Sequence, residues 1–334
     1  MSFRSSTSAC ERRHGSTHEA RLYSEHVRVS VGLPIDRSDP SGQFVSGAGI
    51  SLTARAAESA GFDAVFATDH PAPDAKWLTH GGHPTLDPFV ALSFAAASTS
   101  RLKVHTNLMV LPYRNPLLAA KNVASLDVLS GGRLILGVGA GYLQPEFAAL
   151  GVPFDDRAAR CDDALDTMIK AWSGEPFDHQ GIDFAAKNII VQPAPTQRPH
   201  PPIWVGGNSM KAIERAVRFA NGWAPMPSPK SSAKFLGTPG MESVDDLRTR
   251  IERLHELLAA AGRDISSFDI AMLPAQQTHF GDQNASPQAV IDEAHQLAEA
   301  GVTVLVVNVA GEHPVEFAEN VAKWGAEILP HLPR

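Results

Sequence analysis

Asp69 and His70 are two ionisable residues that directly follow the apolar segment 64–68. A histidine can donate or accept a proton near neutral pH, so it could act on a bound molecule. The alternative is a histidine that only braces the long loop 69–87, which is rich in proline and glycine. Loops of this length usually shape a site. We therefore take His70 as the candidate catalytic residue, with Asp69 beside it.

A second candidate lies inside the apolar segment 102–110, where Asn107 precedes Leu108. A polar amide within a strand must find hydrogen-bond partners. At the open end of a sheet it could meet a bound ring, but it could equally satisfy a neighbouring backbone group. Asn107 alone is therefore weak evidence for a site.

Glycine-rich stretches follow two further apolar segments. The first consists of Gly139, Ala140, Gly141 and Tyr142, and the second of Gly206, Gly207 and Asn208. Glycines at a strand end let a flat molecule approach the backbone, because no side chain intervenes. A tight turn with positive φ would explain them equally well. The spacing of the first stretch differs from that of a dinucleotide-binding fingerprint.

The second stretch lies directly before a predicted helix, so its free amides and the positive end of the helix dipole could bind a phosphate. Asn208 could instead be only a helix N-cap. In many barrels the phosphate site follows strands seven and eight, whereas this stretch follows the fifth predicted strand.

A metal site is the rival interpretation of the loop 69–87. His80 and His83 lie in it, and with Asp69 and His70 they could hold zinc. However, the first predicted strand lacks the His-x-His pair that we expect of barrel hydrolases, and loop histidines are more often solvated. We therefore predict no metal.

The elements that position these candidates alternate along the chain. Apolar, β-branched segments alternate with helical patterns, which predicts parallel strands joined by helices. The predicted strands are residues 27–33, 64–68, 102–110, 134–138, 203–205, a short segment at Trp223, 268–273 and 302–309. The predicted helices are residues 51–60, 88–98, 116–129, 156–172, 210–220, 245–261, 287–300 and 315–329.

Eight strand–helix pairs match the closure of an α/β fold of the (β/α)8 TIM barrel type, whose site lies at the C-terminal ends of the strands. A doubly wound open sheet is the competing fold, but no GxGxxG motif follows the first strand. We predict one barrel domain over residues 27–334, with insertion segments. These are a hairpin near 177–184 and a mobile loop or lid at 225–243.

The composition excludes several classes of protein. Of the 334 residues, 43% are hydrophobic and 19% are charged, which excludes a disordered or fibrous chain. The formal net charge of −7, without a basic stripe, argues against nucleic acid and against an anionic membrane as partners. Only Cys10 and Cys161 are present, so no disulfide framework forms and a cytoplasmic location fits best.

Residues 1–26 are rich in Ser and Arg, but they lack the apolar core of a secretory signal. We expect a flexible N-terminal tail, or a start site assigned too early. Apolar runs such as 302–309 are too short to span a bilayer.

Several motifs, in the same order, resemble the luciferase-like monooxygenases. They are GFDAVFATDH at 61–70, LPYRNP at 111–116, LD at 126–127, SGGRLILGVG at 130–139, PPIWVGGN at 201–208 and ANGW at 220–223. The resemblance extends from residue 27 to the C-terminal helix. Within the family, the sequence is most similar to the branch that uses the deazaflavin coenzyme F420, although FMN-dependent members share many of these residues.

The resemblance implies a role for each candidate. Asp69 and His70 would flank the reactive ring of the cofactor, with His70 as the residue for proton transfer or oxyanion contact. Asn107 and Leu108 would form a bulge behind the ring, which in F420-dependent relatives contains a non-prolyl cis peptide.

The glycine-rich stretches have implied roles as well. Gly139, Ala140, Gly141 and Tyr142 would line the ring and part of the substrate pocket. Backbone amides of Gly206 and Gly207, with Asn208, would bind the cofactor phosphate. Tyr142 stands where sugar-phosphate dehydrogenases of the family have a catalytic glutamate, so oxidation of glucose 6-phosphate is not expected and His70 is the only obvious acid or base.

The resemblance therefore implies an F420-dependent oxidoreductase that transfers a hydride between the deazaflavin and a small-molecule substrate. An FMN-dependent monooxygenase is the alternative, and a barrel that binds flavin without turnover is the second alternative. Either enzyme would depend on a separate flavin or F420 reductase, and a homodimer is compatible with the family.

Overall fold

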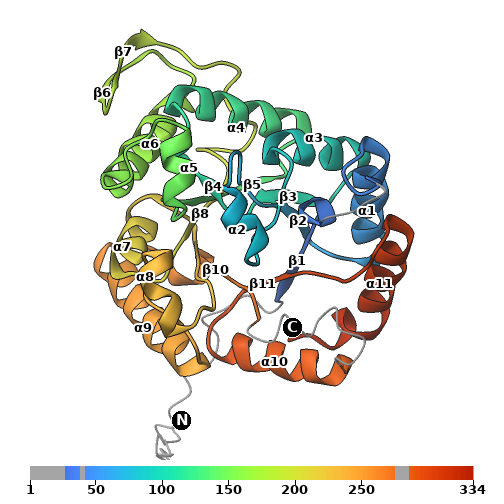
Figure 1. The fold of residues 1–334 in the computed structure, drawn as a ribbon. Helices are drawn as coiled ribbons and strands as arrows, with labels where there is room; N and C mark the ends of the chain where they lie inside the picture. The colour runs from blue at the N-terminus through green and yellow to red at the C-terminus, as the bar shows by residue number, and fades with distance from the viewer. Residues whose placement is uncertain (1–26, 38–41, 275–285, 334) are drawn as a thin grey trace, which may run out of the picture.

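The computed structural model describes residues 27–37, 42–274 and 286–333. The expected tail at 1–26 lies outside the described residues, and so does Cys10. Figure 1 looks along a central barrel of strands that is surrounded by a ring of helices.

The barrel is one closed sheet of parallel strands. β3 and β4 are consecutive strands that share one position in the barrel, and both pair with β5. The nine strands of the described chain therefore fill eight positions. β11 pairs with β1 and closes the sheet. The strands are β1 (Arg28–Gly32), β2 (Ala64–Ala67), β3 (Lys103–Thr106), β4 (Met109–Val110), β5 (Leu134–Gly139), β8 (Ile203–Gly206), β9 (Gly222–Ala224), β10 (Asp269–Met272) and β11 (Val304–Val307). The predicted (β/α)8 barrel is confirmed, because an open doubly wound sheet would not close.

Eight helices form the ring, and local sequence sets their ends. Asp87 caps one of them by accepting hydrogen bonds from the backbone N–H groups of Phe89 and Val90. Gly61, with φ of 94°, ends another in the left-handed conformation that glycine adopts easily. The helices are α1 (Gly47–Ala60), α3 (Pro88–Ser98), α4 (Pro116–Ser130), α6 (Arg157–Ala171), α7 (Met210–Phe219), α9 (Val244–Ala260), α10 (Pro287–Glu299) and α11 (Pro314–Glu327).

The apolar core has two parts because strand side chains alternate between the two faces of the sheet. One part fills the space between the strands and the helices. The other fills the barrel and is built from Phe66, Ile135, Trp204, Ala224, Ala271, Val304 and Val306. His105 lies among them, fully buried, with its ring 5.1 Å from that of Trp204 and its Nε2 2.7 Å from Ser30 Oγ.

Polar side chains close the base of the barrel, where the strands begin. Arg28, the first residue of β1, forms an ion pair with Asp269, the first residue of β10. Trp204 Nε1 donates a hydrogen bond to the same carboxylate over 3.1 Å.

Within the residues that the structure describes, four insertions interrupt the alternation. The predicted hairpin is present as β6 (Phe177–Gly181) and β7 (Phe184–Ile189), which are antiparallel and project beyond α6 in Figure 1. Two short helices that the sequence did not predict, α2 (Ala75–Thr79) and α5 (Gln144–Ala149), follow β2 and β5.

The predicted lid, residues 225–243, contains a short helix, α8 (Ala233–Leu236), and its two ends are joined by paired backbone hydrogen bonds between Ser228 and Met241. In the described part of the chain, no helix is long and apolar enough to cross a membrane.

Candidate active site

Leu108 forms an apolar floor at the C-terminal end of the barrel. Its side chain is half-buried, as is that of Leu273, and both pack on the interior cluster. A Cβ atom at Gly206 would lie 1.9 Å from Leu108 Cδ1, and one at Gly137 would lie 2.9 Å from Leu108 Cδ2. Gly206 therefore makes room for Leu108, whereas a Cβ atom at Gly137 would first meet the carbonyl oxygen of Thr106, at 2.1 Å. The Asn107–Leu108 peptide bond is cis, as the resemblance implies.

Gly139 lies two residues nearer the mouth than Gly137, on the same side of β5. A Cβ atom at Gly139 would lie 3.6 Å from Leu108 Cδ1 and 3.8 Å from Leu108 Cβ, in ordinary van der Waals contact with that side chain. The following residues, Ala140, Gly141 and Tyr142, are half-buried, and Gly141 has the positive φ, 81°, of a tight turn.

Asp69 and Asn107 connect the ends of neighbouring strands. The buried carboxylate of Asp69 accepts a hydrogen bond from the backbone N–H of Val110 over 2.9 Å and holds both terminal nitrogens of Arg114. The backbone N–H of Asn107 donates to the carbonyl oxygen of Ala67 over 2.8 Å. Asp69 is thus paired inside the protein, in the bidentate geometry that binds a carboxylate most firmly.

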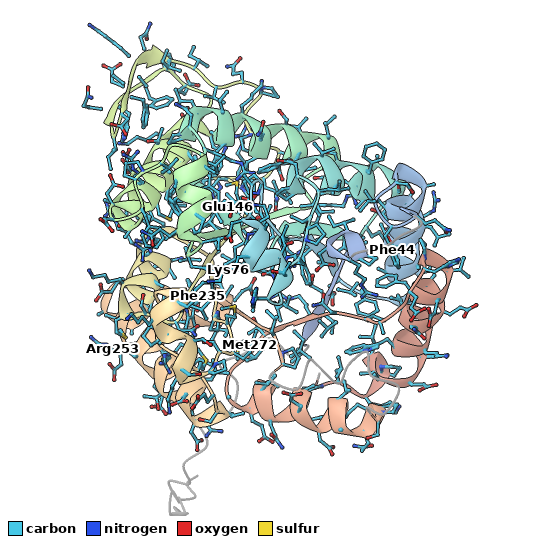
Figure 2. All side chains as sticks on the ribbon, viewed as in Figure 1. Phe44, Lys76, Glu146, Phe235, Arg253 and Met272 are labelled. Atoms are coloured by element: carbon cyan, nitrogen blue, oxygen red, sulfur yellow. The ribbon has the colours of Figure 1, made fainter. Side chains whose placement is uncertain are left out.

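His70 lies against a buried carboxylate that sequence analysis missed. Its Nδ1 is 3.4 Å from Oε2 of Glu146, whose side chain is 0% exposed. The hydroxyl of Tyr113 donates to the same oxygen over 2.9 Å, and the backbone N–H of Ala72 donates to Oε1 over 2.8 Å. Figure 2 shows Glu146 on the inner side of the ring of helices.

The environment sets the ionisation of these groups. Burial would raise the pKa of Glu146, but its contacts with His70, Ala72 and Tyr113 outweigh burial and hold that pKa below the ordinary value. Burial and the Glu146 charge raise the pKa of the Tyr113 hydroxyl, and they also raise that of Tyr142. At neutral pH, Glu146 is therefore ionised and both tyrosines stay protonated.

Aromatic rings surround the imidazole of His70. The ring of Trp77, on α2, has its centre 4.4 Å away, and those of His83 and Tyr142 are 5.3 and 6.2 Å away. Phe235 on α8 contacts Tyr142, with 5.8 Å between the ring centres. Two insertions therefore bring aromatic side chains to the same side of the barrel.

Asn208 connects the barrel to the segment 225–243. Its side-chain nitrogen donates to the carbonyl oxygens of Met226 and Pro239, and its side-chain oxygen accepts from the backbone N–H of Met226. Its own backbone N–H donates to Thr238 Oγ1. The N-cap of α7 is Ser209. Asn208 is thus not the N-cap, and its side chain and backbone N–H bond to residues 226–239.

Two histidines of the rival metal site, His80 and His83, bond to different groups of the protein. His80 Nδ1 donates to the carbonyl oxygen of Lys76, while His83 Nε2 lies 3.1 Å from Thr68 Oγ1. Within residues 27–37, 42–274 and 286–333, no three His, Cys, Asp or Glu side chains are grouped so that they could hold a metal ion.

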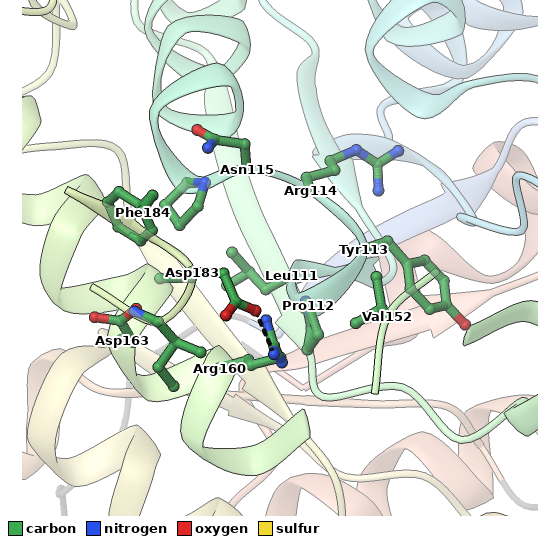
Figure 3. A pocket seen from close by; sticks show the side chains of 13 residues that line it. Leu111, Pro112, Tyr113, Arg114, Asn115, Val152, Arg160, Asp163, Asp183 and Phe184 are labelled. Carbon is green, nitrogen blue, oxygen red and sulfur yellow. Dashed lines mark hydrogen bonds and ion pairs between the residues drawn. The ribbon is translucent and has the colours of Figure 1, made fainter. Parts of the chain in front are cut away.

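One pocket lies outside the barrel mouth, between the residues that follow β4, helix α6 and the hairpin β6–β7. Arg160 and Asp183 form an ion pair beside it over 2.6 Å. Figure 3 shows that the side chains of Tyr113 and Arg114 extend away from this pair. Their functional groups belong instead to the contacts with Glu146 and Asp69, so we do not assign the active site to this pocket.

Sequence analysis missed Glu146. It follows the first glycine-rich stretch in a segment where no helix was predicted, although Pro145 before an acidic residue is typical of a first helical turn.

Comparisons with known proteins agree with this architecture. A model of the luciferase-like monooxygenase family matches residues 33–301. An FMNH2-dependent dimethylsulfone monooxygenase of Pseudomonas putida is 31% identical over 239 residues, which cover 71% of this chain and 60% of the relative.

Solved structures share the fold. A monooxygenase from Streptomyces bottropensis superposes with a TM-score of 0.74 at 20% identity, over 91% of this chain and 99% of its own. The coenzyme F420 dependent tetrahydromethanopterin reductase from Methanopyrus kandleri has a TM-score of 0.68 at 19% identity, over 92% of this chain and 99% of its own. Because the family model spans most of the barrel, the chain belongs to the luciferase-like monooxygenase family.

Proposed function

We propose that this chain is an F420-dependent oxidoreductase that transfers a hydride between the deazaflavin and a small organic substrate. The contact of His70 with the buried, ionised Glu146 carries this proposal. His70 would serve as the acid–base group at the barrel mouth, where Leu108 and Leu273 present apolar surface.

The residues at the mouth fit a planar tricyclic ring. Leu108 and Leu273 present half-buried apolar surface, and Gly139 adds no side chain of its own beside Leu108. Covering such surface with a flat ring is favourable by about 25 cal/mol per Å². These residues would hold the ring, while Ala140 and Tyr142 would line the substrate side.

A bound deazaflavin supplies the hydride donor or acceptor, and the protein supplies orientation and a dry site. His70 would take up or release the proton at the substrate atom that gains or loses it as the hydride moves. Asp69 would hold the backbone next to His70 in place, because its carboxylate is fixed by Arg114.

The anionic tail of the cofactor would meet the backbone N–H groups of Gly206 and Gly207 in front of α7. Gly207 has φ of 108°, a conformation that favours glycine. Asn208 would fix this turn through its contacts with residues 225–243, and it would not bind the phosphate itself.

An FMN-dependent monooxygenase is the second candidate, and one observation favours it. The relative from Pseudomonas putida, at 31% identity, is named for its dependence on FMNH2. The F420 proposal is supported by the resemblance of the motifs and by the fold shared with an F420-dependent reductase. If FMN is the cofactor, a separate reductase would have to supply it in reduced form. A barrel that binds flavin without turnover is the third candidate.

Anaerobic titration of the full chain with F420 and with FMN, followed by fluorescence, separates the two enzymes. We expect tight binding of F420, and tight binding of FMN alone would overturn the branch assignment. Gly139→Ala should weaken binding of the true cofactor, because its methyl group fills the space above Leu108. A thermal unfolding curve controls for stability, which this ordinary contact should leave nearly unchanged.

A cytoplasmic location remains a prediction from the number of cysteines. We also propose that the chain forms a homodimer. Large apolar side chains are exposed on the adjacent helices α3 and α4, namely Val90 (58%), Phe94 (49%), Leu118 (66%) and Leu129 (76%). Such a surface is typical of an interface. Sedimentation of wild type and of Leu118→Glu tests this, since a monomeric wild type would contradict it.

A further inference from the structure

Glu146 is the most deeply buried carboxylate at the barrel mouth, and it lies 76 residues from His70 in the sequence. It belongs to α5, which follows β5, whereas His70 follows β2. The contact therefore joins two loops that the order of strands in the barrel brings together. A buried carboxylate is costly unless hydrogen bonds satisfy it, so the arrangement around Glu146 needs an explanation.

We propose that Glu146 is a positioning residue for His70: its carboxylate keeps the imidazole proton on Nδ1 and leaves Nε2 as the proton acceptor for a substrate. The role in turnover rests on the proposed function, whereas the position of the proton can be measured without any substrate.

The other contacts of Glu146 show why the carboxylate acts as an acceptor toward His70. Oε1 receives the backbone N–H of Ala72 and Oε2 receives the hydroxyl of Tyr113, both within 2.9 Å. These donors and His70 hold the pKa of Glu146 below its ordinary value, despite the opposing effect of burial. An ionised carboxylate only accepts hydrogen bonds, so the imidazole nitrogen that faces it must carry a proton.

The second nitrogen of His70 is left available. Nε2 has no hydrogen-bond partner among the described residues, and no buried side-chain nitrogen or oxygen of that part of the chain lacks a partner. Nε2 therefore belongs to the part of the side chain that reaches solvent, since 11% of the side chain is exposed. A nitrogen fixed in this way is the acceptor that proton transfer requires.

The remaining neighbours hold the ring without competing for its proton. Trp77 packs against it at 4.4 Å, and Tyr142 contributes its ring at 6.2 Å. Burial lowers the pKa of His83, so this second histidine stays neutral at neutral pH. Asp69 is occupied by Arg114. Glu146 is thus the charged group that sets the orientation of His70.

Long-range ¹H–¹⁵N spectra of the full chain, labelled on histidine, test the inference directly. The His70 signals are assigned by their loss in His70→Ala. At a pH where the ring is neutral, we expect Nδ1 to carry the proton in the wild type. Glu146→Gln should lose this preference, whereas Tyr113→Phe should keep it, because it removes another donor and leaves the carboxylate.

Glu58→Gln is the matched control, since the Glu58 carboxylate also accepts backbone N–H groups, from residues 100–102, far from the site. It should leave the His70 signals unchanged. A wild-type ring with the proton on Nε2, or identical His70 signals in Glu146→Gln, would overturn the proposal. If Glu146→Gln fails to fold, the wild type and Tyr113→Phe still decide the question.

Kinetics then separate this inference from the proposed function. With the cofactor that binds, Glu146→Gln should lower kcat by about 100-fold, as expected when a general base loses its orientation, and change KM little. A higher KM at constant kcat would contradict the positioning role. If no cofactor supports turnover, the proposed function is wrong. The NMR spectra still show whether Glu146 keeps the proton of His70 on Nδ1.

Discussion

The barrel contains two histidines in opposite circumstances, one in its interior and one at its mouth. His105 is fully buried, and its partners are the hydroxyl of Ser30 and the carbonyl oxygen of Thr106. Burial lowers its pKa to about 4. His70 is 11% exposed and its partner is the ionised carboxylate of Glu146.

The difference teaches that depth and partner, not residue type, decide what a histidine does. In the interior, neutral polar groups satisfy a neutral ring, and desolvation by burial outweighs the stabilisation that the Thr106 carbonyl oxygen gives to the charged form. At the mouth, a carboxylate can stabilise a charge on the ring, and one nitrogen is left for a ligand. We therefore expect the interior histidine to affect stability and the one at the mouth to affect activity.

The largest effect should come from His70→Ala. With the cofactor that binds, we expect kcat to fall by about 10² to 10⁴-fold, because a positioned acid–base group is lost. The free energy of unfolding should change little. His80→Ala, at an exposed histidine of the same loop, is the control. Unchanged turnover in His70→Ala would remove His70 from the mechanism.

The free energy of unfolding should fall by about 3 kcal/mol as the pH falls, because of His105. The pKa of this group is about 4 in the folded chain and 6.5 ordinarily, so the unfolded chain binds a proton first. Stability should therefore decrease from pH 6.5 toward pH 4 and then level off.

The measurement is the difference in unfolding free energy between wild type and His105→Gln, followed across this pH range. We expect the advantage of the wild type to shrink as the pH falls. A difference that stays constant would mean that His105 titrates normally. His80→Gln should leave the pH dependence as it is.

Ser30→Ala tests the role of His105 by removing its hydrogen-bond partner. It leaves Nε2 of His105 without its 2.7 Å contact in the barrel interior. Denaturant unfolding should show a loss of about 1–3 kcal/mol, the cost of an unsatisfied buried group. Ser51→Ala, at a half-buried serine between α1 and α3, should cost less. A large loss of activity at full stability would contradict the structural role of Ser30.

The smallest effect should come from Trp77→Leu, at the ring that packs on His70. An aromatic pair contributes about 0.5–1.5 kcal/mol, so the rate should fall by about two- to tenfold. Steady-state kinetics at saturating cofactor measure it. A loss as large as that of His70→Ala would show that Trp77 itself contacts the reacting atoms.

The barrel was predictable because the local signals of its strands and of the helices that surround them agreed with it. Strand segments were short, apolar and bounded by glycine or proline, and Gly61 and Pro88 marked helix ends where the structure has them. The bulge at Asn107 and Leu108 followed from the resemblance. The short helices α2 and α5 carried too few residues for a periodic pattern.

The site was predictable only in part, because its partners depend on the closure of the barrel. His70 could be singled out from its place at a strand end, but the buried Glu146 lies 76 residues away, and only tertiary contacts bring the two together. The partners of Asn208 could not be predicted for the same reason. Its partners belong to residues 225–243, which no local pattern connects to the second glycine-rich stretch.

The carboxamide of Asn208 has a consequence for how this barrel could be modified. It bonds to Met226 and Pro239, near the two ends of the segment that carries Phe235. Thr238 and Ser228, inside the stretch between them, also accept hydrogen bonds from Asn208. Residues 229–237, which include α8, could therefore be exchanged as a cassette with these anchors and the strands kept, so a new aromatic or polar side chain could be delivered next to Tyr142.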